Sequence, residues 1–128
     1  MIYLDSSIVL ARLFAEDRSP PDSAFLSSPV SSRLLEYEVW NRIHAHGLTR
    51  SHGQQARDLI DRVTQFDLTP TVLARALEPF PAPVRTLDAL HLATIEYLRS
   101  QGHSVDLASY DNRLIAGAHA LGIPLFDV

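Results

Sequence analysis

The sequence predicts a three-layer α/β fold in which helices flank a central parallel β-sheet. Short apolar runs alternate with helical segments along the whole chain, which is typical of a parallel sheet covered on both faces. The opening residues 1–4 form a continuous apolar run, as expected of a strand that is buried on both sides. A length of 128 residues suits a single domain, residues 1–128.

The first half of the chain predicts two strands and four helices. After the strand at 1–4, Ser6 or Ser7 is expected to cap a helix. A polar loop over 16–22 places proline to open a short helix near 24–26, and 29–32 is expected to be a short strand. Helices over 33–46 and 51–63 follow, and Gly47 ends the first of them.

The second half continues the alternation. A strand is expected over 66–68, and Thr69-Pro70 begins a helix that ends before Pro79. Thr86 is expected to cap a long helix that runs to Ser100. A strand over 105–109, a helix over 111–121 and a last strand over 123–126 complete the chain.

The composition excludes several classes of protein. The chain has no cysteine, which rules out a disulfide framework and thiolate metal sites. No apolar run is long enough to span a bilayer and no basic flank of a signal peptide is present, so a cytoplasmic location is expected. The net charge of −4 argues against an ordinary nucleic-acid-binding protein, although a bound divalent cation would offset acidity locally.

Aspartates follow two of the expected strands. Asp5 comes directly after the first apolar run, and Asp111 follows the strand at 105–109. In open α/β sheets ligands collect at the carboxyl ends of the strands. Aspartate is also a preferred helix cap, so this pair alone is a weak signal.

Asp88 is the most informative acid. Its helix, beginning Leu87-Asp88-Ala89-Leu90-His91, is apolar nearly all round and is therefore expected to be buried. The helix dipole contributes about 0.3–1 kcal/mol to a first-turn carboxylate, which does not offset the several kcal/mol cost of burying an unpaired charge. A nearby cation would offset this cost. His91, one turn later, is expected to be a buried histidine satisfied by a neighbour.

Two glutamates, Glu36 and Glu38, lie on the helix at 33–46. Glu38 falls beside an apolar face of this helix and could pair with Arg42, whereas Glu36 lies nearer Trp40. The residues alone do not separate the two glutamates. Several carboxylates without soft ligands suit hard cations such as Mg²⁺ or Mn²⁺, and such ions stabilise phosphodiester cleavage.

The chain resembles PIN-domain ribonucleases, and most closely the compact VapC-type toxins of toxin–antitoxin pairs. The resemblance covers nearly the whole sequence, through the segments Leu4-Asp5-Ser6-Ser7, Ser32 to Val39, Leu87 to Ala93, Ser109 to Leu114 and Ala120 to Leu125. The segment around Asp88 is the most specific of these.

The resemblance implies a set of site residues. Asp5, Asp88 and Asp111 match the family's metal-binding aspartates, and counting from Ser32 selects Glu38 as the family glutamate, with Glu36 in reserve. Ser7 and Ser109 match hydroxyl positions that support the site; the second is often threonine in the family. Arg113 is the arginine best placed by sequence to hold the RNA backbone.

These observations predict a Mg²⁺- or Mn²⁺-dependent endoribonuclease, in which the acids hold the metal that activates a water for attack on RNA. The resemblance further implies a toxin neutralised by a cognate antitoxin, a homodimer and a toxin–antitoxin hetero-oligomer, with no membrane partner. The alternative is a PIN-like RNA-binding module with little or no turnover. A phospho-receiver domain would need a lysine, which the chain lacks, and a haloacid-dehalogenase-type phosphatase would need an aspartate where Ser7 stands.

Overall fold

A four-stranded parallel sheet occupies the centre of the computed structural model, which describes residues 1–15 and 17–128. The strand order is β3-β2-β1-β4, and every pairing between neighbours is parallel. The strands are short: β1 Ile2–Leu4, β2 Val30–Ser32, β3 Thr64–Phe66 and β4 Asp106–Ala108. The predicted fold class is confirmed.

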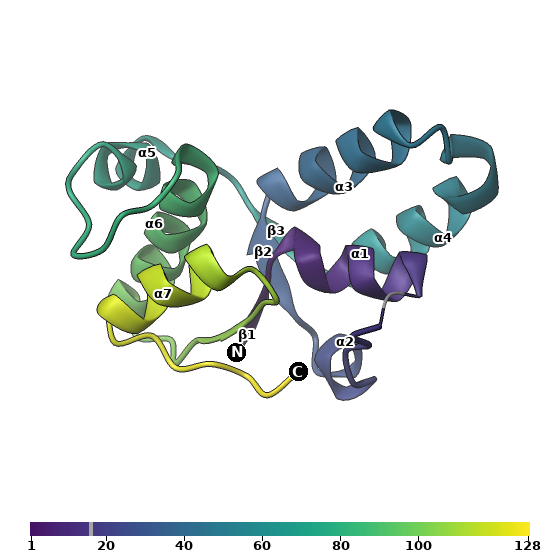
Figure 1. Ribbon diagram of the computed structural model, residues 1–128. Coiled ribbons are helices and arrows are strands. Elements are labelled where there is room, and N and C mark those ends of the chain that lie inside the picture. Colours follow the sequence, from purple (N-terminus) through teal and green to yellow (C-terminus); the bar gives the residue numbers. More distant parts are fainter. Residues whose placement is uncertain (16) are drawn as a thin grey trace.

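Helices cover both faces of this sheet and make three layers (Figure 1). Helices α1, α3 and α4 contact one another on one side, and α6 contacts both α5 and α7 on the other. The bounds are α1 Ser6–Phe14, α2 Ser23–Leu26, α3 Leu34–Ala45, α4 Thr49–Asp61, α5 Pro70–Ala76, α6 Thr86–Ser100 and α7 Asn112–Ala120. Across the described residues, none of these helices is both long and apolar enough to cross a membrane.

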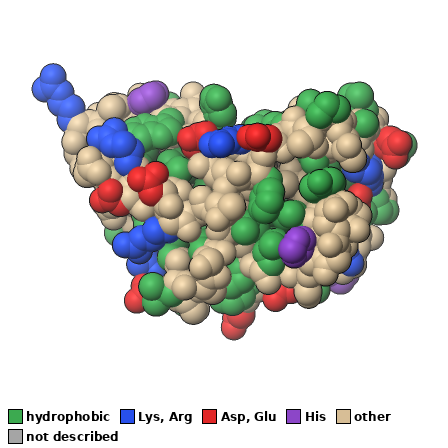
Figure 2. All heavy atoms as spheres, turned by 180° about the vertical axis from the view of Figure 1, so that it is seen from behind, with side chains coloured by type: hydrophobic (Ala, Val, Ile, Leu, Met, Phe, Trp, Pro, Cys, Tyr) green, Lys and Arg blue, Asp and Glu red, His purple; other side chains and the backbone are tan. Residues whose placement is uncertain are grey.

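Two hydrophobic cores lie on the two faces of the sheet because successive side chains of a strand point to opposite faces. Tyr3 packs in the core shared by α6 and α7, whereas its neighbour Leu4 packs in the core shared by α1, α3 and α4. Both side chains are fully buried. Seen from behind, a notch separates the two groups of helices at the surface (Figure 2).

Several element boundaries differ from those expected. The strand expected over 66–68 lies at Thr64–Phe66, because the Thr69 backbone N–H donates to the Asp67 carbonyl and turns the chain there. The helix expected over 51–63 begins at Thr49 and ends at Asp61. The last expected strand, 123–126, is reduced to a single parallel bridge between Leu125 and Leu107, since Pro124 has no N–H to extend the ladder.

The helix caps also depart from expectation in two places. Asp5, and neither Ser6 nor Ser7, is the N-cap residue of α1, and its carboxylate makes no capping hydrogen bond. Arg85, rather than Thr86, is the N-cap residue of α6. Thr69 caps α5 as expected, accepting the Val72 N–H at 3.4 Å. The loop expected over 16–22 includes Glu16, which lies outside the described residues.

A close contact between α6 and α7 generates a stability prediction. A Cβ added at Gly117 would lie 2.8 Å from Leu92 Cδ1 and 2.9 Å from Val84 Cγ1. We expect Gly117→Val to lower the free energy of unfolding by about 1–3 kcal/mol in chemical denaturation, because the core is overpacked. Ala116→Val, at an exposed position of the same helix, should change it by about 0.5 kcal/mol. Equal losses in the two variants would contradict this packing.

Candidate active site

The carboxyl ends of β1 and β4 border an open cavity of about 500 Å³. Because these strands are adjacent and parallel, Asp5 and Asp111, which follow them, are brought to the same edge of the sheet. α6 and α3 contribute further polar side chains to the same cavity. The charged residues that line it are Asp5, Asp88, Asp111, Glu38, Arg18, Arg42 and His91.

Asp5 is almost completely buried at the floor of this cavity, with 4% of its surface exposed. The Ser7 hydroxyl donates to its Oδ1 at 2.6 Å. Burial raises the pKa of Asp5 to about 6, although the Ser7 hydroxyl and nearby His91 lower it. Because its carboxylate does not cap α1, Asp5 is left available to a ligand, and a bound cation would favour its charged form.

Asp88 is the third residue of α6 and is 7% exposed. The backbone N–H of Arg85 donates to its Oδ2 at 3.2 Å, which ties the carboxylate to the first turn of the helix. Burial raises the pKa of Asp88, the Arg85 hydrogen bond lowers it, and the negative charge of Asp111 raises it further. The buried first-turn acid predicted from the sequence is therefore present, and it faces another acid.

Asp111 caps a helix and also lines the cavity. It is the N-cap of α7, and its Oδ1 accepts the backbone N–H groups of Arg113 at 3.0 Å and Leu114 at 3.5 Å. The Ser109 hydroxyl in turn accepts the Asp111 N–H at 2.9 Å. The cap interpretation of this residue is correct, but a cap occupies only Oδ1, and the exposed side chain also lines the cavity.

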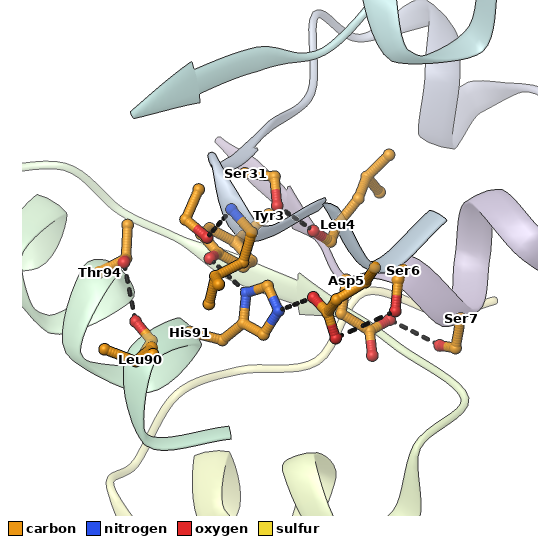
Figure 3. Close-up of polar contacts among 12 residues, drawn as sticks. Tyr3, Leu4, Asp5, Ser6, Ser7, Ser31, Leu90, His91 and Thr94 are labelled. Atoms are coloured by element: carbon orange, nitrogen blue, oxygen red, sulfur yellow. Dashed lines mark hydrogen bonds and ion pairs between the residues drawn. The ribbon is translucent and has the colours of Figure 1, made fainter. Parts of the chain in front are cut away.

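Glu38 is held by a histidine rather than by the arginine considered from the sequence. His91 Nε2 lies 2.6 Å from Glu38 Oε1, and His91 Nδ1 lies 2.7 Å from the Tyr3 hydroxyl. Figure 3 shows His91 reaching from α6 toward the end of β1, between Tyr3 and the Asp5–Ser7 segment. Within the described chain, no ion pair joins Glu38 to Arg42. Glu38 also accepts the Ser6 hydroxyl at 3.4 Å.

Two residues considered from the sequence, the reserve glutamate Glu36 and the substrate-binding candidate Arg113, lie outside the cavity. Glu36 pairs with Arg33 at 3.6 Å and lines a different cavity, on the outer side of α3. The structure therefore brings Glu38, and not Glu36, beside the aspartates. Arg113 borders a neighbouring cavity next to Arg85 instead of the acids, and its role in substrate binding stays a prediction.

Ser7 and Ser109, the two serines that the resemblance selects, each contact the backbone beside an aspartate of the cavity. Ser7 Oγ donates to Asp5 and also accepts the Tyr110 backbone N–H at 2.9 Å, which connects the end of β1 to the loop after β4. Ser109 is buried beneath Asp111. Each hydroxyl thus fixes the backbone around one of the aspartates.

The donor set suits a hard divalent cation. All four acids offer carboxylate oxygens, which Mg²⁺ and Mn²⁺ prefer. In residues 1–15 and 17–128 no three His, Asp or Glu side chains are already arranged to hold one ion together. Mg²⁺ usually keeps several waters and needs only one or two protein carboxylates, so a ready-made group of three ligands is not required for it.

Several residues of the cavity were not identified from the sequence. Arg18 and Arg42 line it and are both exposed; Arg18 also lies over the Tyr110 ring, at 5.4 Å from its centroid. Arg18 lies within the polar loop 16–22, whose sequence carries no pattern pointing to the site. His91 was expected to be buried and satisfied, which is confirmed, but its partners come from two distant segments.

A parallel α/β sheet with acids gathered at its strand ends is the arrangement of the PIN domain. The family model described as "PIN domain" matches residues 2–120 of this chain. The chain belongs to the PIN-domain family.

Individual relatives agree with this assignment. Ribonuclease VapC46 of Mycobacterium tuberculosis (strain ATCC 25618 / H37Rv) is 35% identical, over 95% of this chain and 93% of the relative. Ribonuclease VapC35 of the same organism is 31% identical, over 96% of this chain and 93% of the relative. A toxin–antitoxin complex from Klebsiella pneumoniae contains a chain of the same fold, with a TM-score of 0.63, 16% identity and 94% of each chain covered. The VapC-type resemblance is confirmed.

The His91–Glu38 pair generates a pH prediction. Burial lowers the pKa of His91, but its contacts with Tyr3 and Glu38 outweigh burial and raise the pKa to about 10. A histidine pKa raised on folding contributes stability that is complete below the unfolded value of about 6.5 and is lost as the pH rises toward the folded value. We expect the free energy of unfolding, measured in chelator, to fall between about pH 7 and pH 10.

His91→Gln is the control for this prediction, because glutamine keeps polar atoms near both partners but does not titrate. Its free energy of unfolding should be lower at pH 7 and nearly constant up to pH 10. A wild type whose stability does not change over this range would show that His91 and Glu38 form no ion pair.

Proposed function

We propose that this protein is a Mg²⁺- or Mn²⁺-dependent endoribonuclease that acts as the toxin of a toxin–antitoxin pair. The observation that carries the proposal is the meeting of Asp5, Glu38, Asp88 and Asp111 in one open cavity, with two arginines at its walls. Membership of the PIN-domain family and relatives named ribonucleases support the choice of RNA as substrate. The toxin–antitoxin complex that shares this fold supports the toxin assignment.

The acids have distinct environments and therefore distinct tasks. Asp5, Asp88 and Asp111 would hold the metal; burial raises the pKa values of Asp5 and Asp88, and a bound cation would favour their charged forms. Glu38 is oriented by His91, so its carboxylate is fixed before substrate arrives. The bound metal would supply Lewis-acid stabilisation of the charge that develops on the phosphodiester and a lowered pKa for water.

The arginines at the walls would hold the RNA backbone. Arg42 follows Glu38 by one helical turn, and Arg18 lies on the opposite wall beside Tyr110. Guanidinium groups bind phosphate oxygens in a bidentate manner and remain charged at any physiological pH. They would keep a polyanion close to a group of acids that otherwise repels it.

The proposal includes the partners and location expected of such a toxin. A cognate antitoxin would bind in the cytoplasm and place a basic group near the four acids, where it competes with the metal by charge. A homodimer and a toxin–antitoxin hetero-oligomer are the assemblies that we propose.

The first test of this function is loss of cleavage. Asp88→Asn keeps the shape of the side chain and removes its charge, so cleavage of total RNA should fall by at least roughly a hundredfold. Glu38→Gln should inactivate similarly, whereas Glu36→Gln, outside the cavity, should keep wild-type activity. Cleavage is measured by gel with Mg²⁺ or Mn²⁺ present.

Circular dichroism should show that each variant is folded, and Asp88→Asn should no longer arrest growth when expressed alone. Full cleavage of RNA by Asp88→Asn would show that the acids take no part in the mechanism. If the wild type binds RNA but does not cleave it with either metal, the protein is an RNA-binding module and not a nuclease.

The second test uses stability and metal rather than activity. Repulsion among unpaired acids destabilises the metal-free fold, so Asp88→Asn should melt at a higher temperature than the wild type in chelator. Added Mg²⁺ or Mn²⁺ should stabilise the wild type by about 2.7 kcal/mol at a hundredfold excess over Kd, a shift on the order of 10 °C.

Asp88→Asn should gain much less from metal because it has lost a ligand. If Asp88→Asn melts below the wild type in chelator and metal shifts both proteins equally, these acids do not share a metal site. Thermal melts of both proteins with chelator, with Mg²⁺ and with Mn²⁺ provide the six measurements needed.

A further inference from the structure

The end of the helical hairpin formed by α3 and α4, residues 39–57, carries positive charge in a protein that is acidic overall. Residues 39–57 contain three arginines and three histidines but no aspartate or glutamate, whereas the whole chain has a net charge of −4. Arg42, Arg50 and Arg57 are all exposed. Figure 2 shows one basic side chain projecting at the upper left, with another basic side chain and a histidine nearby and two acidic side chains below them. Residues 39–57 therefore complement a polyanion, whereas Glu36, Glu38, Asp58 and Asp61 at the other end of the hairpin do not.

Aromatic rings lie on the same hairpin. Tyr37 is 69% exposed, and the ring of Trp40 packs over Gly53 of α4. The Arg57 guanidinium lies 5.6 Å from the centroid of the Trp40 ring. The His44 ring lies 5.8 Å from the same ring, tilted by 36°. These rings border a cavity of about 450 Å³ lined by Glu36, Tyr37, Trp40, Asn41 and His44.

This aromatic cavity adjoins the acid cavity along α3. Tyr37 and Asn41 line the aromatic cavity, and the next residue in each case, Glu38 and Arg42, lines the acid cavity. Consecutive helical residues differ by 1.5 Å along the axis and about 100° around it. The two cavities therefore occupy different flanks of one helix, and a strand that leaves the acids past Arg42 continues around α3 toward the aromatic rings.

We propose that the outer face of the α3–α4 hairpin holds the RNA beside the acid cavity, an inference that rests on the proposed function. An unpaired base stacks on Tyr37 and Trp40, and the exposed Arg50 and Arg57 contact phosphates of the same strand. Aromatic faces bind bases of any sequence. Arginine supplies the positive charge that attracts phosphate, which the carboxylates of the neighbouring cavity cannot supply.

The chemistry of the cavity favours a nucleic acid over an apolar protein segment. Polar side chains alternate with the rings, and the Asn41 amide is able to hydrogen-bond a base edge. The acid at this cavity, Glu36, is paired with Arg33 and so repels an incoming phosphate less. Unstacked bases and exposed phosphates are the features that single-stranded RNA offers.

Binding of a fluorescently labelled RNA stem-loop, followed by anisotropy in chelator so that no cleavage occurs, tests this proposal. The double variant Arg50→Gln/Arg57→Gln should bind roughly tenfold more weakly at low salt. The slope of its log affinity against log salt should be smaller by about 1.4, since two phosphate contacts are lost. Tyr37→Ala, a change at an exposed position, should also weaken binding roughly tenfold.

Arg62→Gln is the matched control. Arg62 is also exposed, but it lies at the far end of α4, about 18 Å along the helix axis from Arg50. Arg62→Gln removes one exposed arginine charge, half of that removed by the double variant, outside the proposed surface, so affinity and salt slope should remain at wild-type values. Equal weakening by Arg62→Gln, or wild-type binding by the double variant, overturns the proposal.

Trp40 is the single tryptophan of the chain and provides a direct readout of stacking. Saturating the wild type with unlabelled stem-loop should quench tryptophan fluorescence, and Tyr37→Ala should reduce the quenching. Unchanged fluorescence at saturation overturns the stacking contact. If the variants instead shift the sedimentation coefficient while RNA affinity is unchanged, the hairpin is an interface between copies and the proposal is wrong.

Kinetics separate this inference from the function on which it rests. With metal, Arg50→Gln/Arg57→Gln should raise KM with kcat nearly unchanged, because neither arginine lines the acid cavity. If the wild type neither binds nor cleaves RNA, both the proposed function and this inference are wrong. If the wild type cleaves RNA and the variants bind RNA as tightly as the wild type does, only this inference is wrong.

Discussion

The hydrogen bonds from Tyr3 through His91 to Glu38 are the constraint on which the site depends. Tyr3 belongs to the central strand β1, His91 to α6 on one face of the sheet, and Glu38 to α3, which packs on the other side. His91 is 2% exposed, so its two ring nitrogens have no water to replace these partners. The relative position of the two halves of the molecule is therefore set by the same contact that orients an acid of the cavity.

This arrangement separates the tasks of the four acids. The Glu38 carboxylate lies beside the His91 ring, whereas burial is the largest influence on Asp5 and Asp88 and raises their pKa values, although the charge of His91 lowers both. Asp111 reaches solvent while its Oδ1 caps α7. Charge at this edge of the sheet is thus only partly balanced within the chain, which is consistent with a site that binds a cation.

Much of this organisation could be predicted from the sequence. The burial of Asp88 follows from the apolar surroundings of its helix, and the capping position of Asp111 follows from a strand, an acid and a helix in succession. The choice between Glu36 and Glu38 could not be made from the residues alone, because both lie on flanks of α3 whose surroundings are set by other elements. The counting rule of the family selected Glu38, and the structure places it beside His91.

Other features depend on tertiary contacts that no local pattern encodes. The short strands occur where neighbouring strands supply partners, so their bounds shift by one or two residues from the apolar runs. Arg18 and Arg42 become neighbours of the acids only when the loop after α1 and the side of α3 converge on the same cavity. Ligand-binding residues on loops are in general harder to recognise from sequence than those on buried, strongly patterned helices.

The hydroxyl of Ser7 has a consequence for the kinetics of ion exchange. Its oxygen donates to the Asp5 carboxylate and accepts the Tyr110 N–H, so the distance between the end of β1 and the loop that carries Asp111 is set by a neutral group. Ser109 similarly holds the backbone of Asp111. Because these contacts need no cation, a hard cation that binds here would find both segments already positioned, and the rate at which it enters would be limited by the stripping of its own water shell.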